Sequence, residues 1–520
     1  MLIKNLVSGL GGEGAAAEQP LAGARACKVA ANLFDVSARI MKSSGARLAA
    51  EWAGDESAFG GAFSVWAMYN LGTDYVAVTA PLKKDDPSFP TLTGSYVQAY
   101  RFERRITSLF GITAKGHPDP RPWIKHESWP ADSFPLRKSF TSEKPLPRAD
   151  GSYEFVKAVG EGVFEIPVGP VHAGIIEPGH FRFLAVGEKV LNMEEKLGYV
   201  HKGIEKRFES LSWDEATKLA GRVSGDSTVA HALAYSLAFE KMTGHEPPAR
   251  ACWVRALLLE RERVANHLAD LAAICNDAAF AFAYYQFWNL RERMLRTNKK
   301  LFGHRLLMDA VAPGGTRVDI SAFGKSAIEE ELEFVLPEFE KIMKIYEDSP
   351  SLKDRLYNTG VLPPSAAQEM GLVGFAARAS GQPTDARKQW VFPPYDVVIP
   401  KTHLLTSGDV HARAWVRIEE IRDSARMILQ ILEKTPEGEI FSPPPRPASA
   451  GAGFAAVEGW RGEVLYWVQS APDGKINRCM VRDPSDVNWL ALEQAVKEDM
   501  VPDFPLNNKS WNNSYSGNDL

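Results

Sequence analysis

Two different periods of hydrophobic and polar residues follow one another along this chain, and they predict how it is organised. Between residues 61 and 115, the runs FSVWAMYNL and DYVAVTAPL are rich in β-branched and aromatic residues and are separated by GTD, which is typical of two strands joined by a turn. The next stretch, SYVQAYRFERRITSLFGI, predicts a helix that ends at Gly111. We therefore expect a small α/β module, with residues 1–60 as its N-terminal helical segment and residues 61–140 as its body and a proline-rich arm.

A larger domain is predicted after the linker TSEKPLPRADGSYE, residues 141–154. It begins with the pattern of a short β-meander, FEIPVGPVHAGIIEPGHFRFLAVGEKVLNMEEKLGY, and long stretches of helical spacing follow, one of them opened by Ser212 and Glu215 at capping-box spacing. GEVLYWVQSAPDGKINRCMVRDPS predicts a β-hairpin that turns at Pro472, Asp473 and Gly474. The predicted fold class is α+β, in which the small module precedes a large, mainly helical domain with a β-hairpin edge at residues 155–520.

The most hydrophobic long window is LADLAAICNDAAFAFAYYQFW at residues 268–288. Asp270 and Asp277 lie within it, and a bilayer would disfavour both charges, so we expect one buried helix rather than a membrane span. The first twenty residues lack the continuous apolar stretch of a signal peptide. If the protein works at a membrane, other chains are expected to hold it there.

Charge and cysteine content exclude several function classes. The formal net charge of −5 gives no electrostatic reason to expect a nucleic acid partner. The four cysteines are scattered without metal-ligand spacing, so an iron–sulfur cluster held by this chain is not expected. No G-x-G-x-x-G follows a predicted strand, so the chain gives no sign of binding NAD.

Several long motifs occur in the order found in one known family. GPVHAGIIEPGHFRF, LGYVHKGIEKRFE, ALLLERERVANHL, GHRLLMDAVAPGG and NTGVLPPSAAQEMGLVGFAARASG resemble the 49 kDa (D) subunit of respiratory complex I and the large subunit of membrane-bound nickel–iron hydrogenases. RFERRITSLFGITAKGHPDPRPWIKHESWPADSFPLRKSF resembles the 30 kDa (C) subunit of complex I. The chain therefore resembles a fused C–D subunit, and EPGHFRF and GHRLLMDAVAPGG are more similar to the hydrogenase side.

The resemblance also identifies where metal ligands are missing. Nickel–iron hydrogenases hold their metals with two CxxC pairs, because soft thiolates suit nickel and low-spin iron. The first pair corresponds to Ser224 and Ser227 in GRVSGDSTVAH, and the second to Ser514 and Gly517 in NNSYSGNDL. A serine hydroxyl is a poor nickel ligand and glycine has no ligand, so nickel is predicted to be absent.

Complex I lacks these cysteines too and uses the vacated pocket for a quinone. Its quinone-binding His and Tyr correspond here to Glu177 and Leu219, and a leucine cannot donate a hydrogen bond to a quinone carbonyl. Glu177 instead matches a glutamate that hydrogenases use for proton transfer, and a carboxyl group in a partly apolar pocket can relay protons. The candidate catalytic residues are Glu177, His172 and His180, although any single histidine can equally be a structural group. The candidate lining of the cofactor pocket is Arg222, Asp226, His231, Asp409 and His411.

By resemblance, the chain is an oxidoreductase subunit that works only inside a multi-subunit complex. Electrons would arrive from a 4Fe–4S cluster in a partner small subunit, a quinone is a candidate acceptor, and this chain alone would bind no cofactor. The expected partners are that iron–sulfur subunit, a membrane anchor and antiporter-like subunits that translocate protons or cations, on the cytoplasmic side of the cell membrane. Three alternatives stay open, namely a quinone-reducing NADH dehydrogenase subunit, a non-catalytic scaffold, and an active nickel–iron hydrogenase.

Overall fold

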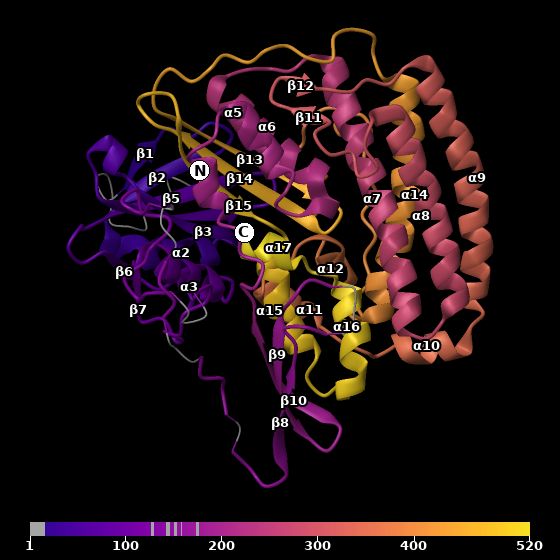
Figure 1. The fold of residues 1–520 in the computed structure, drawn as a ribbon, viewed down its shortest axis with the longest axis horizontal. Coiled ribbons are helices and arrows are strands. Elements are labelled where there is room, and N and C mark those ends of the chain that lie inside the picture. Colours follow the sequence, from indigo (N-terminus) through magenta and orange to yellow (C-terminus); the bar gives the residue numbers. More distant parts are fainter. Residues whose placement is uncertain (1–15, 126–128, 142–145, 150–152, 158, 173–175) are drawn as a thin grey trace.

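The computed structural model describes residues 16–125, 129–141, 146–149, 153–157, 159–172 and 176–520. Figure 1 shows the N-terminal module beside a larger domain, whose long helices stand side by side at the far end of the molecule. The α+β architecture predicted from the sequence is confirmed.

The N-terminal module is built on a five-stranded sheet with the order β1-β2-β5-β4-β3. Its neighbouring strands are antiparallel except for the parallel pair β2 and β5. The predicted turn joins β4 to β5, and Gly111 ends helix α3 in the left-handed conformation at φ +65°. The elements of this module are β1 (Ala16–Gln19), β2 (Arg25–Val29), α2 (Phe34–Ser43), β3 (Arg47–Asp55), β4 (Phe63–Asn70), β5 (Tyr75–Leu82), β6 (Ser88–Pro90), α3 (Ala99–Phe110) and β7 (Thr113–Lys115).

The prediction of a helical segment at residues 1–60 is wrong for the part that the structure describes. Residues 16–60 contain three strands of the sheet, with α2 as their one α-helix. Most residues of β2 and β3 are buried, and this burial explains the difference, because alanine-rich strands in a sheet core look helical in sequence. Residues 1–15 of this segment lie outside the described residues, as do 142–145 and 150–152 of the linker. The domain boundaries themselves remain a prediction.

The predicted β-meander is an antiparallel three-stranded sheet with the order β10-β9-β8, and it extends away from the body of the molecule (Figure 1). Its strands are β8 (Val163–Val168), β9 (His180–Val186) and β10 (Lys189–Lys196).

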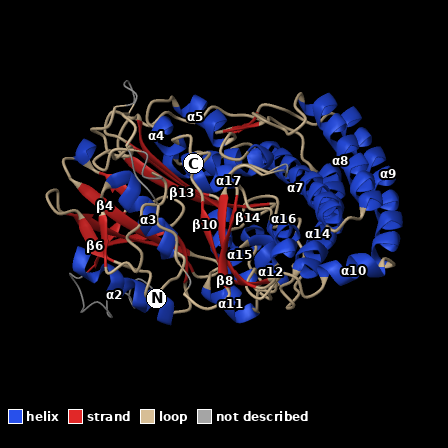
Figure 2. Ribbon diagram, turned by 60° about the horizontal axis from the view of Figure 1, so that its bottom comes forward, coloured by secondary structure: helices blue, strands red, loops and turns tan. Residues whose placement is uncertain are grey.

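The large domain is mainly helical, and Figure 2 shows its longest helices gathered on the side away from the first sheet. Helices α7, α8, α9 and α14 pack against one another as a bundle, and Ser212 forms the predicted capping box at the start of α5. The helices are α4 (Ile204–Phe208), α5 (Trp213–Ala220), α6 (Thr228–Thr243), α7 (Ala249–Asp277), α8 (Ala281–Phe302), α9 (Ala322–Glu347), α10 (Pro350–Leu356), α11 (Pro364–Glu369), α12 (Gly374–Ala379), α13 (Ala386–Gln389), α14 (Val410–Lys434), α15 (Ser485–Ala495), α16 (Phe504–Trp511) and α17 (Tyr515–Asp519). Short strands β11 (Val311–Ala312) and β12 (Gly315–Thr316) form a separate pair.

The predicted single helix at residues 268–288 is wrong, because the chain breaks there between α7 and α8. Ala279 lies at φ +59° between them, a left-handed conformation that no helix continues through. Phe282 and Tyr285 at the start of α8 are exposed. Among the described residues, no helix has an apolar stretch long enough to cross a membrane.

A second sheet joins the two parts of the chain. The predicted hairpin consists of β14 (Gly462–Ser470) and β15 (Ile476–Arg482), and β13 (Gly451–Gly459) pairs with β14 on its other side. Helix α6 packs on this sheet, while Trp467 lies 5.5 and 5.3 Å from Trp52 and Trp66 of the first sheet, measured between ring centroids. The first module is therefore fastened directly to the sheet that carries the site described below.

Candidate functional site

Two serines from distant parts of the chain meet in the interior. Ser224 precedes a short 3-10 helix before α6, and Ser514 precedes α17, yet their Oγ atoms lie 2.8 Å apart. Ser514 Oγ also accepts the Gly517 N–H at 2.9 Å, which caps α17 and fixes the rotamer of the serine. The structure thus brings both ends of the predicted ligand set to one place.

An ion pair stands beside the two serines. Arg461, in the tight turn between β13 and β14, donates to both carboxylate oxygens of Asp226 at 2.7 Å, and Ser224 Oγ donates to the same carboxylate at 2.8 Å. Arg461 also donates to Ser227 Oγ at 3.1 Å. Burial favours the neutral form of Asp226, but Arg461 and the serine hydroxyl outweigh it and lower the pKa of Asp226. We call Ser224, Ser514, Asp226 and Arg461 the serine site.

The buried carboxyl group of Asp483 occupies the space that a metal-binding side chain at position 517 would need. A Cβ atom built on Gly517 would fall 2.5 Å from Cγ and 2.6 Å from Oδ2 of Asp483. Asp483 Oδ2 is 3.0 Å from His231 Nε2, and His231 Nδ1 is 3.1 Å from the Tyr466 hydroxyl, all of them fully buried. Burial raises the pKa of Asp483, but the bond to His231 prevails and lowers it to about 2.

These residues do not fit a nickel centre of the hydrogenase kind. The site offers hydroxyl groups in place of thiolates, and the Asp483 carboxylate fills the space that a side chain at Gly517 needs. Across the part of the chain that the structure describes, no group of three or more His, Cys, Asp and Glu side chains is arranged to hold a metal ion. The absence of nickel remains a prediction.

Glu177 reaches the wall of the serine site. Its Oε2 accepts the Ser516 N–H at 3.0 Å, two residues beyond Ser514. Lys202 lies near enough for its charge to interact with Glu177; burial lowers the pKa of Lys202, and Glu177 partly opposes the shift. Glu177 as a whole is an exposed residue. It therefore connects solvent with the segment that carries Ser514.

The two neighbouring histidines have different surroundings. His180 Nδ1 lies 3.0 Å from the Gly169 carbonyl oxygen and its Nε2 accepts from Arg182 at 3.4 Å, so both ring nitrogens have partners. Burial lowers the pKa of His180, which favours a neutral, structural imidazole at the start of β9. The ring of His172 stacks on Phe181, and its buried Nε2 has no hydrogen-bond partner among the described residues.

Three residues that were predicted to line the pocket lie outside the serine site, namely Arg222, Asp409 and His411. Arg222 makes a half-exposed ion pair with Asp309 at 2.5 Å, because the turn after α5 directs its side chain outward. Asp409 caps α14 by accepting the Ala412 N–H at 2.8 Å, which is a structural role.

His411, the third of these residues, stacks on Tyr357 with ring centroids 4.1 Å apart and lines a separate cavity of about 320 Å³. Burial lowers the pKa of His411 there. Leu219, at the position of the complex I tyrosine, packs partly buried against the main hydrophobic core.

Sequence reasoning missed Arg461, Asp483 and Tyr466. Each lies at the end of a predicted strand or inside one. A polar residue at such a position is often part of a turn or of the surface, so it does not stand out as a site residue. A signal was available in the WRG and VRDPS stretches, because charged residues directly flank strands that are otherwise apolar.

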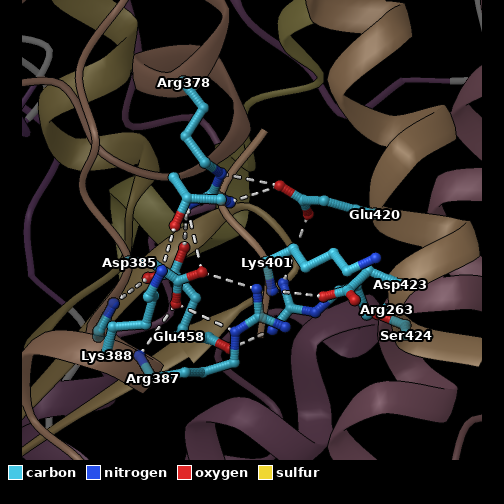
Figure 3. Close-up of polar contacts among 12 residues, drawn as sticks. Arg263, Arg378, Asp385, Arg387, Lys388, Lys401, Glu420, Asp423, Ser424 and Glu458 are labelled. Atoms are coloured by element: carbon cyan, nitrogen blue, oxygen red, sulfur yellow. Dashed lines mark hydrogen bonds and ion pairs between the residues drawn. The ribbon is translucent and has the colours of Figure 1, made fainter. Parts of the chain in front are cut away.

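A network of buried charges lies under the β13 end of the sheet (Figure 3). Arg378 donates to Glu420 at 2.8 Å and to Glu458 at 2.9 Å, and Arg387 pairs with Asp385 at 2.7 Å. All five side chains are buried. Burial raises the pKa of Glu458, and Arg378 counters only part of that rise. The network joins α12, α13, α14 and β13, so removing one partner would leave an uncompensated buried charge.

A second chain of contacts connects the serine site with the helix bundle. Arg461 Nε donates to the Asn512 carbonyl oxygen at 2.6 Å, and Asn512 Nδ2 donates to Asp270 at 2.6 Å. Arg417 on α14 donates to the other oxygen of Asp270 at 2.9 Å. Arg413 of the same helix donates to the carbonyl oxygens of Gly360 and Gly408.

Two family models match the chain. Residues 28–145 match the respiratory-chain NADH dehydrogenase 30 Kd subunit, and residues 278–449 match the 49 Kd subunit of the same enzyme. The order of the two matches is that of a fused chain.

Individual relatives come from both branches of this group. Formate hydrogenlyase subunit 5 of Escherichia coli is 30% identical over 475 residues, covering 89% of this chain and 83% of that protein. NADH-quinone oxidoreductase subunit 4 of Thermus thermophilus is 29% identical over 396 residues, covering 71% of this chain and 96% of that protein. A chain in the structure of the membrane-bound sulfane sulfur reductase, an archaeal respiratory membrane complex, matches with a TM-score of 0.66 and 26% identity, covering 70% of this chain and 100% of that chain.

Proposed function

This chain belongs to the family of fused 30 kDa and 49 kDa subunits shared by respiratory complex I and the membrane-bound hydrogenases, and from that premise we propose that its serine site receives electrons for the reduction of an organic acceptor. The chain is an oxidoreductase subunit of a membrane-associated complex. The expected donor is a 4Fe–4S cluster in a neighbouring small subunit. The expected partners also include a membrane anchor and antiporter-like subunits that hold the chain at the cytoplasmic side of the membrane.

One observation carries the proposal: the positions that bind metal in hydrogenases converge here on hydroxyl groups and an arginine–carboxylate pair. Ser224 already donates its hydroxyl proton to Asp226, so Ser514 is the hydroxyl that can turn to donate a hydrogen bond to a quinone carbonyl, and Arg461 can stabilise negative charge that develops on the carbonyl oxygen. The Ser514 hydroxyl offers the donor that Leu219 cannot supply. Reduction of a quinone to a quinol takes two electrons and two protons.

Glu177 is the proposed route for protons from solvent. Its exposed carboxylate holds the Ser516 N–H, so a proton taken up there arrives two residues from Ser514. An exposed glutamate that also contacts the buried segment of Ser516 suits a role in which protons are taken from water and passed inward. A scaffold without chemistry would need no such group.

The test uses the purified complex, reduced by a stoichiometric amount of dithionite and mixed with decylubiquinone as the probe acceptor. Reoxidation of the partner clusters, followed by visible absorption, reports electron transfer through this chain. We expect Glu177→Gln to slow reoxidation by about 10²-fold while the complex stays assembled. Glu165→Gln is the matched control, because Glu165 is an exposed glutamate of β8 paired with Arg182.

Unchanged reoxidation in Glu177→Gln would favour the scaffold alternative. A wild-type complex that reduces no decylubiquinone, but does reduce an organic trisulfide, would move the acceptor class toward sulfane sulfur. Near-stoichiometric nickel in the purified complex would return hydrogen chemistry to consideration.

A further inference from the structure

A small cavity has Asp226 of the serine site in its wall. It has a volume of about 10 Å³ and lies between the short 3-10 helix before α6 and the helices α7 and α8. A space of this size holds about one water molecule when polar groups surround it. Its polar lining consists of Asp226, Glu262, Asn266, Arg291, Asn298 and Arg305.

Glu262 is the buried acid of this cavity. Its two carboxylate oxygens accept the N–H groups of Val229 and Ala230, in the first turn of α6, at 2.7 and 3.2 Å. Only 5% of the residue is exposed, and no ion pair joins it to a cation within the described ranges. A carboxyl group without a paired cation is free to change its protonation state without breaking a salt bridge.

The other charges around Glu262 come from three directions. Asp226 faces it from the serine site, Arg263 lies next to it on α7, and Arg291 reaches in from α8. The buried Nε of Arg291 has no hydrogen-bond partner among the described residues. Burial raises the pKa of Glu262 to about 8, with Asp226 adding to the rise, while the two backbone N–H groups and Arg263 oppose it.

The outer end of the cavity reaches the surface. Arg305 lines the cavity and is itself partly exposed, in an ion pair with Glu292 at 2.5 Å. The inner end is Asp226, whose carboxylate accepts the Ser224 hydroxyl, and Ser224 Oγ lies 2.8 Å from Ser514 Oγ. One water molecule is therefore enough to link Glu262 with the serine site.

We propose that Glu262 is a proton-relay residue, which delivers one of the two protons from the α7–α8 surface to the acceptor bound at the serine site, while Glu177 delivers the other, so that loss of either acid slows the reaction. The Ser514 hydroxyl gives its proton to the acceptor oxygen and takes the proton of Ser224, whose hydroxyl turns from Asp226 toward Ser514. Asp226 then returns a proton to Ser224, and the Glu262 carboxyl group supplies that proton to Asp226 through the cavity water. Solvent entering beside Arg305 then returns one proton to Glu262, so no net charge is left on the chain. The electrons come from the partner cluster, and this relay rests on the proposed function.

The test repeats the reoxidation assay with decylubiquinone on the assembled complex. Glu262→Gln should slow reoxidation by about 10²-fold and enlarge the solvent deuterium isotope effect. In the wild type, the rate should fall as pH rises through about 8, because Glu262 loses its proton there, and that fall should be absent in the variant. The control is Glu103→Gln, because Glu103 is a buried acid of α3 that, like Glu262, accepts a backbone N–H, here that of Leu92, and it lies outside the cavity.

The outcomes separate the two proposals. A wild-type complex that transfers no electrons to the probe refutes the proposed function, whereas a normal wild type with an equally fast Glu262→Gln refutes the relay alone. If Glu262→Gln does not assemble, Glu262→Asp keeps a titratable group at the site. The shorter acid should retain turnover with a displaced pH profile, and an unchanged profile would overturn the proposal.

Discussion

Replacing Gly517 by alanine adds one methyl group at a point where a carboxylate already lies. The new Cβ would be 2.5 Å from Cγ of Asp483, far inside van der Waals contact. Asp483 cannot simply move away, because His231 and the Ser485 N–H hold its two oxygens at 3.0 and 2.8 Å. Either the acid shifts and weakens these bonds, or α17 is displaced.

The cost can be estimated from two opposing effects. Adding a methyl group to a packed interior costs about 1–3 kcal/mol. Alanine in a helix is more stable than glycine by about 0.5–1 kcal/mol, and Gly517 lies inside α17. We therefore expect Gly517→Ala to lower the free energy of unfolding by about 1–2 kcal/mol.

Urea denaturation of the purified full-length chain, followed by tryptophan fluorescence, measures this change. Gly94→Ala is the matched control, because a Cβ at Gly94 would meet no atom within 4 Å and neither glycine has a positive φ. The control should change the free energy of unfolding by less than about 0.5 kcal/mol.

The interaction between positions 517 and 483 can be isolated by a double-mutant cycle. Asp483→Ala removes the carboxylate, so Gly517→Ala should cost less in that background, where the close contact left is Ser514 Oγ at 2.9 Å from the new Cβ. Asp483→Ala alone is destabilising because it leaves His231 Nε2 without its partner. An alanine at 517 that is as stable as wild type would show that the site has room for a side chain. The argument that Asp483 blocks the fourth metal ligand would then fail.

Three further predictions concern stability and metal content. Glu463 pairs with Arg47 of the first module and with Arg482 of β15, and the two arginines together lower the pKa of Glu463 from 4.5 to about 2 against the effect of burial. Its charge should therefore contribute about 3 kcal/mol above pH 4.5 and lose that contribution as pH falls toward 2. Glu463→Gln should accordingly be most destabilising at neutral pH in urea titrations, and a destabilisation that does not shrink between neutral pH and about pH 3 would contradict this. Arg222→Ala should change the free energy of unfolding by less than about 1 kcal/mol, since its ion pair is half exposed, and a larger loss would mean a buried role. Ser224→Cys combined with Ser227→Cys should bind no near-stoichiometric nickel by elemental analysis, and nickel retained by that variant would argue against our assignment of the site.

Contacts between the first module and the large domain affect all of these experiments. Arg105 of α3 donates to the Asn518 carbonyl oxygen at 2.6 Å, so the first module contacts α17, the helix that Ser514 caps. Leu520 is buried, and its carbonyl oxygen accepts the Lys202 and Ile204 N–H groups. Variants that loosen the first module should therefore also disturb the serine site.

Sequence alone determined the features that depend on neighbouring residues. The β4–β5 pair, the end of α3 at Gly111, the capping box at Ser212 and the turn at 472–474 all follow from short-range conformational preferences. The order of long motifs determined the family, and the loss of all four cysteines could be seen at once. Short-range rules failed at residues 16–60, where an alanine-rich strand looks like a helix, and at the break near Ala279.

Only the tertiary structure decided which polar side chains share a site. Ser224 and Ser514 are far apart along the chain, and their contact depends on the tertiary packing of α17, which contacts α15. Tertiary packing also placed Arg461 beside Asp226 and Asp483 against Gly517, and it left Arg222 on the surface. Residue type and spacing cannot predict such contacts, because the direction of a side chain is set by the long-range packing of the element that carries it.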